Sequence, residues 1–204
     1  DHRDLHSFPT RRSSDLGASA GPALCLTAGI HGDEINGVEI ARRVFSSLDP
    51  ARMSGSVVIL PMINLSGIRS GERYMADRRD LNRLFPGRRD GSLSSIVAGS
   101  VFKVVTRHCK ALIDLHTGSF SRLNTPQIRV TLDRPSALDM ARHFGSGVVV
   151  LGDGPRRSLR REASEAGLDA IIYEAAGPHR FDPEAAQVGA DGVRSVMAWM
   201  GILE

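Results

Sequence analysis

Apolar and polar stretches alternate along most of the chain in a way that is typical of α/β proteins. Short apolar runs bounded by polar or turn residues predict strands at 23–29, 56–63, 111–118, 127–132, 147–152 and 169–177. Apolar residues at helical spacing predict helices near 34–48, 94–109, 135–144, 157–167 and 183–200, with Ser94 or Ser95 capping the second. This alternation predicts an α/β sheet with helices on both faces and with its working groups where strands end.

The start of the chain lacks this alternation. Residues 6–16, "HSFPTRRSSDL", have no hydrophobic periodicity and resemble the translation of a sequencing-library adapter. We expect residues 1–16 to be a non-native or disordered leader and residues 17–204 to form one folded domain.

Composition narrows the class of protein. A chain of 204 residues with 41% hydrophobic content can bury the core of one domain. No run approaches the roughly 20 apolar residues of a membrane span, and no signal-peptide pattern is present, so we expect a cytoplasmic protein without a membrane partner. Cys25 and Cys109 lie in separate apolar segments without metal-ligand spacing, which predicts two buried thiols in a reducing compartment.

The positive charge is concentrated in one segment. The formal net charge is +3, and residues 69–90 alone hold seven arginines against four acidic residues. Aromatic residues do not interleave with these arginines and no basic helical stripe is present, which disfavours nucleic acid as a partner. A small acidic substrate fits this segment better.

Polar residues that are suited to metal binding follow two of the predicted strands. His31 and Glu34, in "HGDE", lie at a strand-to-helix turn, and His116 follows the strand "ALIDL". Two imidazoles and a carboxylate with a fourth position for water are typical of catalytic zinc. Glu34 alone could equally be a cap or a solvent-facing residue. Asp114 could orient an imidazole or be an ordinary buried acid.

A second motif lies in the arginine-rich segment. The run "DLNRLFPG", residues 80–87, combines a carboxylate, an amide and a guanidinium with an apolar anchor and a turn. Arg83 can bind a carboxylate bidentately, and Asn82 can add an amide donor. We interpret the other arginines of this stretch as solvated: Arg78, Arg79, Arg88 and Arg89.

Together these motifs resemble the succinylglutamate desuccinylase/aspartoacylase family of the zinc carboxypeptidase clan. The resemblance rests on His-Gly-Asp-Glu after a strand, Arg73 ahead of the "DLNRLFPG" run, His116 after an apolar strand, and Glu174 in "IIYEAAGP", and it extends from about residue 22 to 204. It implies a mixed, largely parallel sheet. It also implies that residues 17–204 are a zinc hydrolase catalytic domain, and that a C-terminal β domain present in other members is missing.

The resemblance also implies a role for each site residue. One Zn²⁺ per chain would be held by His31, Glu34 and His116, with Glu174 as general base and proton shuttle. Arg73 would polarise the scissile carbonyl, and the substrate carboxylate would be bound by Asn82, Arg83 and, among the arginines of "RRSLRR", Arg160.

The implied activity is hydrolysis of a small N-acyl amino acid or a related carboxylate-bearing amide. The acyl group and the amino acid stay open, and a homo-oligomer is compatible with the sequence. Two alternatives also stay open: a zinc carboxypeptidase that acts on peptides, and a catalytically idle metal-binding protein.

Overall fold

The computed structural model describes residues 13–203, with side chains described from residue 17 onward. Its strands are β1 (Ser13–Leu16), β2 (Ser19–Ala28), β3 (Ser54–Leu60), β4 (Ala111–His116), β5 (Asn124–Val130), β6 (Val149–Leu151) and β7 (Asp169–Ala176). Its α-helices are α1 (Ile35–Ser47), α2 (Leu65–Ser70), α3 (Leu93–His108), α4 (Pro135–Phe144), α5 (Leu159–Glu165) and α6 (Pro183–Trp199), and two short 3₁₀ turns are η1 (Pro50–Arg52) and η2 (Leu81–Arg83).

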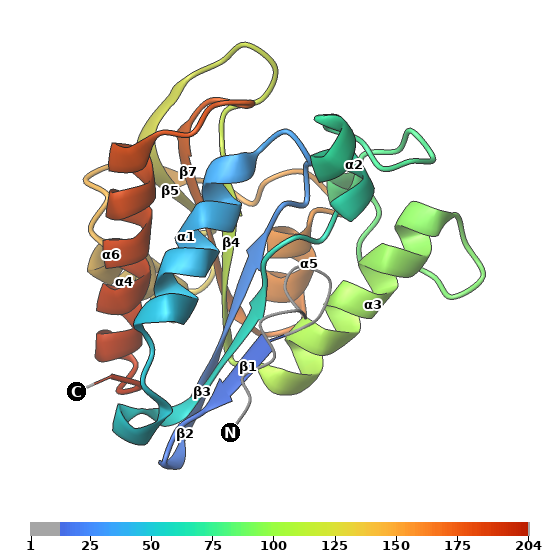
Figure 1. The fold of residues 1–204 in the computed structure, drawn as a ribbon. Coiled ribbons are helices and arrows are strands. Elements are labelled where there is room, and N and C mark those ends of the chain that lie inside the picture. The colour runs from blue at the N-terminus through green and yellow to red at the C-terminus, as the bar shows by residue number, and fades with distance from the viewer. Residues whose placement is uncertain (1–12, 204) are drawn as a thin grey trace.

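All seven strands form one mixed sheet in the order β1-β3-β2-β4-β7-β5-β6. Neighbouring strands are parallel except at two places, where β1 pairs antiparallel with β3 and β5 pairs antiparallel with β7. The prediction of a mixed, largely parallel sheet is therefore confirmed (Figure 1). The parallel centre, β3-β2-β4-β7, brings the carboxyl ends of four strands to one edge.

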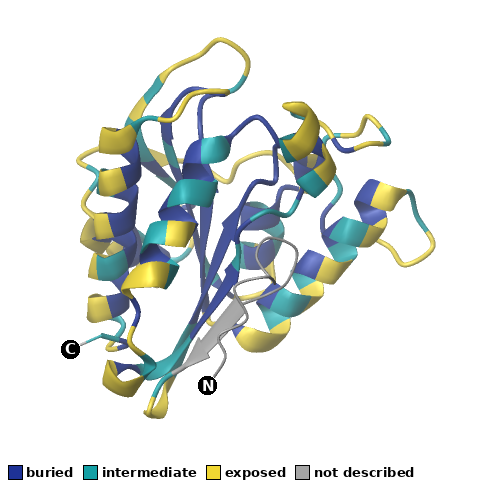
Figure 2. Cartoon of the chain, viewed as in Figure 1, coloured by how far each residue is buried: buried dark blue, intermediate teal, exposed yellow. Residues whose placement is uncertain are grey.

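Helices cover both faces of the sheet, as predicted. Apolar residues of α1, α4 and α6 pack on one face, and those of α3 and α5 pack on the other. The helices in Figure 2 are buried on the side toward the sheet and exposed on the side toward solvent. Within residues 13–203, no helix combines the length and the apolar character that a bilayer crossing requires.

Strand β1 lies at the end of the predicted leader, where Ser13–Leu16 pair with β3. Residues 1–12 of that leader lie outside the described residues, so the leader stays a prediction. Two local features differ from the expectations. Helix α2 follows β3 where no helix was predicted, since six residues are too few for a periodic pattern. The cap of α3 is Ser92, whose hydroxyl accepts from Ser95 N–H, rather than Ser94 or Ser95.

The prediction of two free buried thiols was wrong, because Cys25 and Cys109 form a disulfide. Cys25 lies in β2, and Cys109 directly follows α3, which packs on the same face of the sheet. This packing brings their Cα atoms to 5.7 Å, within the range that a disulfide requires. The inference of a reducing compartment thereby loses its support from the cysteines.

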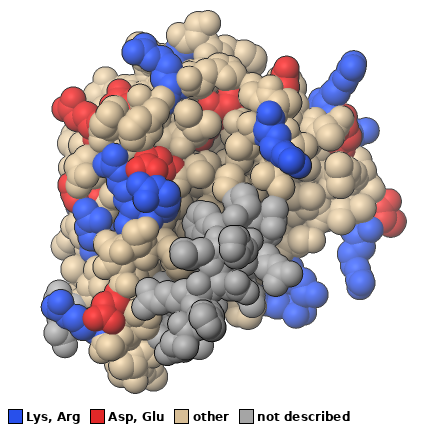
Figure 3. Space-filling view, viewed as in Figure 1, with Lys and Arg blue, Asp and Glu red and all other residues tan. Residues whose placement is uncertain are grey.

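Lys and Arg side chains do not form one continuous basic surface on the part of the face that Figure 3 draws outside the grey residues. Lys and Arg side chains appear there at separate points, interspersed with Asp and Glu.

Candidate active site

The predicted site residues come together because their strands end at the same edge of the sheet. His31 lies three residues beyond the end of β2, and His116 is the last residue of β4. Glu174, near the end of β7, is the register partner of His116 on the neighbouring parallel strand. Glu34 precedes the first residue of α1, the helix that follows β2.

The turn that carries His31 and Glu34 depends on a close backbone approach at Gly32. A Cβ at Gly32 would lie 2.1 Å from the Gly67 carbonyl carbon and 2.5 Å from the Glu72 carbonyl oxygen, so only glycine fits. Gly32 N–H and the Asn64 side chain both donate to the Arg73 carbonyl oxygen, at 3.3 and 3.2 Å. These contacts hold the Arg73 backbone beside the turn.

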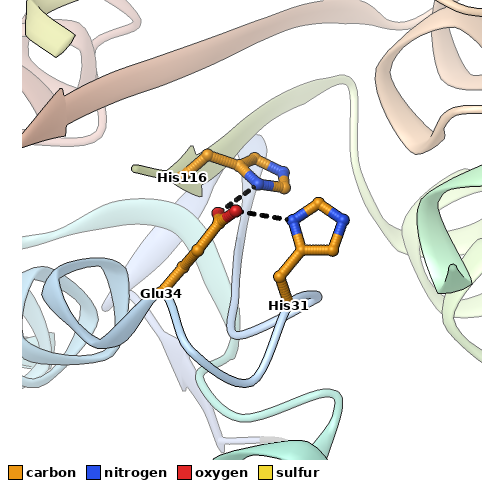
Figure 4. A group of neighbouring side chains, drawn as sticks. All are labelled: His31, Glu34 and His116. Carbon is orange, nitrogen blue, oxygen red and sulfur yellow. Dashed lines mark hydrogen bonds and ion pairs between the residues drawn. The ribbon is translucent and has the colours of Figure 1, made fainter. Parts of the chain in front are cut away.

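The carboxylate of Glu34 lies between the two imidazoles (Figure 4). Its Oε1 is 2.8 Å from His31 Nδ1, and its Oε2 is 2.7 Å from His116 Nδ1. One candidate ligand atom from each of the three buried residues lies within 4.8 Å of the others, and this group could hold a metal ion. A nitrogen–nitrogen–oxygen donor set fits zinc.

Two further carboxylates face the other nitrogens of the imidazole rings. Asp80 Oδ1 lies 3.1 Å from His31 Nε2, and Asp114 Oδ2 lies 2.8 Å from His116 Nε2. Thr27 Oγ1 donates to the second oxygen of Asp114 at 2.7 Å. A carboxylate that accepts from Nε2–H leaves Nδ1 as the metal-binding nitrogen, so the orienting alternative for Asp114 is favoured over an ordinary buried acid.

The charges of this group are mutually dependent. Burial raises the pKa of the Glu34 carboxyl, but the two imidazoles outweigh burial and hold that pKa below its usual range. Burial lowers the pKa of His116, yet Asp114 and Glu34 raise it well above its usual value. Because a metal binds the neutral imidazole, it competes with a proton for Nδ1 in such a site.

A cavity of about 390 Å³ opens beside this group. Its walls include all eight residues that the sequence singled out, namely His31, Glu34, Arg73, Asn82, Arg83, His116, Arg160 and Glu174. The structure brings the eight together, while the role of each stays a prediction.

The predicted substrate-binding residues Asn82 and Arg83 and the predicted catalytic residue Arg73 differ in how their side chains are held. Asn82 is buried, and its Oδ1 accepts from Leu159 N–H at 2.8 Å, so part of its amide is used to join η2 to α5. Arg83 is exposed and donates to the Asn82 carbonyl oxygen. Arg73 Nη1 donates to Glu34 Oε1 at 2.8 Å, which ties it to the donor set.

Arg160 is the most unusual of the predicted residues. It is 2% exposed, and its Nη2 donates to the Gly152 carbonyl oxygen at 2.8 Å. Its Nε and Nη1 are buried without a hydrogen-bond partner among the described residues. A buried guanidinium with free donors on a cavity wall is suited to an anionic ligand group.

Sequence reasoning missed three residues that contact the predicted ones. Asp80 was quoted only as part of its motif, although it faces His31 and also lies 3.7 Å from Arg73 Nη2. Asn124 and Arg129, on β5, both contact Glu174 Oε2. A charged residue within the apolar pattern of β5 was the available signal for Arg129.

A family model and two curated relatives point to the same protein family. Residues 20–200 match the model of the succinylglutamate desuccinylase/aspartoacylase catalytic domain. The chain is similar to N-alpha-acetyl-L-2,4-diaminobutyric acid deacetylase of Halomonas elongata, with 29% identity over 90% of the chain and 56% of that protein. It is also similar to succinylglutamate desuccinylase of Yersinia enterocolitica, with 25% identity over 78% of the chain and 46% of that protein.

A solved structure agrees with these relatives. The crystal structure of a succinylglutamate desuccinylase/aspartoacylase from Rhodobacter sphaeroides superposes with a TM-score of 0.87 and 29% identity, covering 95% of the chain and 59% of that protein. The chain thus spans about half the length of the curated relatives named above. On the match across residues 20–200, the chain belongs to the succinylglutamate desuccinylase/aspartoacylase family of hydrolytic deacylases.

Proposed function

We propose that this protein is a zinc-dependent deacylase that hydrolyses the amide bond of a small N-acyl amino acid carrying a free carboxylate. The observation that carries the proposal is the His31, Glu34 and His116 group on the wall of a cavity that also contains Glu174 and a buried, partly unpaired arginine. The Halomonas relative is named for the deacetylation of an acetylated amino acid, which agrees with this substrate class.

His31, Glu34 and His116 would hold the zinc ion, with Asp80 and Asp114 fixing the two imidazoles through Nε2. When bound, zinc supplies Lewis acidity that acidifies a water molecule and polarises the substrate carbonyl.

The remaining steps belong to side chains of the chain itself. Glu174 takes a proton from the attacking water at its carboxylate as the water oxygen bonds to the carbonyl carbon. It returns that proton to the nitrogen of the leaving amine, so that the C–N bond breaks and an acid and an amine are released. Arg73, beside the donor set, donates to the carbonyl oxygen as negative charge develops there. Arg160 and Arg83 bind the substrate carboxylate, and the cavity limits the substrate to a small molecule.

The proposal is tested on the zinc-loaded chain with a panel of N-acetyl and N-succinyl amino acids, matched with dipeptides of the same C-terminal residues. We expect about one zinc per chain, release of free amine from an acyl amino acid, and little release from dipeptides. Cleavage of dipeptides alone would favour a carboxypeptidase, and bound zinc without turnover across the panel would favour an idle metal-binding protein.

Two variants test the assigned residues on the same samples. His116→Ala should lose most of the zinc, whereas Glu174→Gln should keep zinc and the fold but retain at most about one per cent of the rate. A Glu174→Gln variant with more than about a third of the parent rate at full zinc content would remove Glu174 from the mechanism. Full zinc in His116→Ala would mean that the third ligand is misassigned.

A further inference from the structure

Two side chains of β5 hold one oxygen of the Glu174 carboxylate. Asn124 Nδ2 donates to Glu174 Oε2 at 2.6 Å, and Arg129 Nη2 lies 2.9 Å from the same oxygen. Glu174 Oε1 receives no hydrogen bond from the part of the chain that the structure describes. Both side chains therefore converge on Oε2 of Glu174, a residue that lines the cavity, and leave Oε1 without a donor among the described residues.

The antiparallel pairing of β5 with β7 explains why these two residues reach Glu174. In the register, Gln127 stands opposite Glu174 and Asn124 stands opposite Ala176, with an irregularity between the two pairs. Asn124 and Arg129 thus lie on either side of the residue that faces Glu174 across the ladder. Both also line the cavity.

We propose that Asn124 and Arg129 are positioning residues that fix the Glu174 carboxylate through Oε2, so that Oε1 is presented to the attacking water. This inference rests on the proposed role of Glu174. A carboxylate held by two donors loses the freedom to rotate about its last torsion, and proton transfer depends on heavy-atom distances of about 2.6–3.2 Å.

Arg129 could instead bind the substrate. It is 42% exposed as a side chain, and its Nε is buried without a hydrogen-bond partner within the part of the chain that the structure describes. A substrate-binding arginine acts on KM, since its contact forms in the ground state and in the transition state alike. A positioning residue acts on kcat, and only as long as Glu174 is present.

The test is a double-mutant cycle in the zinc-loaded chain with an N-acyl amino acid that the parent hydrolyses. Arg129→Ala should lower kcat about tenfold or more with less than about a threefold change in KM, because displacement of a catalytic group by about 1 Å can cost a hundredfold. Arg129→Lys should recover part of the loss. In the Glu174→Gln background, Arg129→Ala should change kcat by less than about twofold.

The matched control is Arg134→Ala. Arg134 forms a similar ion pair with Asp169, at the opposite end of β7, and does not line the cavity. Its loss should leave both kcat and KM unchanged. Asn124→Ala should have the same effect as Arg129→Ala: a lower kcat than the parent and an unaltered zinc content.

A second readout does not depend on turnover. In chelator-treated protein, the melting temperatures of Arg129→Ala, Glu174→Gln and the double variant should be non-additive, since the two side chains form one ion pair. Additive changes in melting temperature would overturn the positioning role of Arg129. So would an Arg129→Ala variant with a raised KM and unchanged kcat, or an equal loss of kcat from Arg129→Ala with Glu174 and with Gln at position 174. An inactive parent or an active Glu174→Gln variant would refute the proposed function. The melting temperatures of the four proteins would still decide whether Arg129 and Glu174 interact.

Discussion

Replacement of Arg160 by methionine should make the protein more stable and less able to bind its substrate. Methionine preserves most of the unbranched apolar stem of arginine but removes the guanidinium. This guanidinium is buried. Among the residues that the structure describes, it has one hydrogen bond, to the Gly152 carbonyl oxygen, and its Nε and Nη1 have no partner. Burial lowers the pKa of Arg160, in line with the cost of a buried charge.

The size of the change in the free energy of unfolding follows from these contacts. Each buried unpaired donor costs about 1–3 kcal/mol, while the charged hydrogen bond to Gly152 contributes about 1.5–3 kcal/mol. With two such donors, about 4 kcal/mol of cost at the middle of that range exceeds the contribution of the hydrogen bond, so removal of the whole group should raise the free energy of unfolding by about 2 kcal/mol. For a chain of this size, 1 kcal/mol corresponds to about 2–4 °C in melting temperature.

Substrate binding should change in the opposite direction. A charge-assisted contact between Arg160 and the substrate carboxylate is worth about 1.5–3 kcal/mol, so KM should rise about tenfold to a hundredfold. The assay combines thermal unfolding without substrate and steady-state kinetics with a carboxylate-bearing N-acyl amino acid and its amide analogue. Only the carboxylate-bearing substrate should show the full rise in KM.

Arg161→Met is the matched control, since the neighbouring arginine forms a partly exposed ion pair with Glu165 at 2.9 Å. Such a pair is worth at most about 1 kcal/mol, so this variant should be equally or slightly less stable than the parent and should keep its KM. An Arg160→Met variant that is destabilised by more than about 1 kcal/mol and has an unchanged KM would refute the assignment, because Arg160 would then be a structural residue.

Three further predictions concern other parts of the chain. Asp114→Asn should weaken zinc binding about tenfold to a hundredfold in a chelator competition, because the carboxylate orients His116, and unchanged affinity would count against that role. Arg83→Ala should raise KM for a carboxylate substrate less than Arg160→Met does, since Arg83 is exposed and Arg160 is buried. A larger rise in KM for Arg83→Ala would make Arg83 the main residue that binds the carboxylate. Replacement of both cysteines by alanine should lower the free energy of unfolding in urea by about 2–5 kcal/mol, because the disulfide closes a loop between residues 84 apart, whereas equal stability would exclude the bond.

The sequence alone was enough to predict the alternating strands and helices and the two covered faces of the sheet, and its polar motifs singled out a possible metal site and a carboxylate-binding segment. These features depend on short-range patterns. Arg73, Arg160 and Glu174 were named through the family resemblance instead. Strand and helix periodicity sets local structure, and polar residues that follow apolar strands are brought together once parallel strands share an edge. His31, Glu34 and His116 could be grouped in this way although 85 residues separate the first and the last.

Only the tertiary structure decided which distant groups contact each other. The pairing of Cys25 with Cys109 depends on how α3 packs on the sheet, and no local pattern encodes that distance. The contact of Arg129 with Glu174 requires the antiparallel register of β5 on β7, which a one-residue shift would abolish. Arg160 differs from Arg161 only in the direction of its side chain on α5, so the same residue type is buried and partly unpaired in one case and paired near the surface in the other.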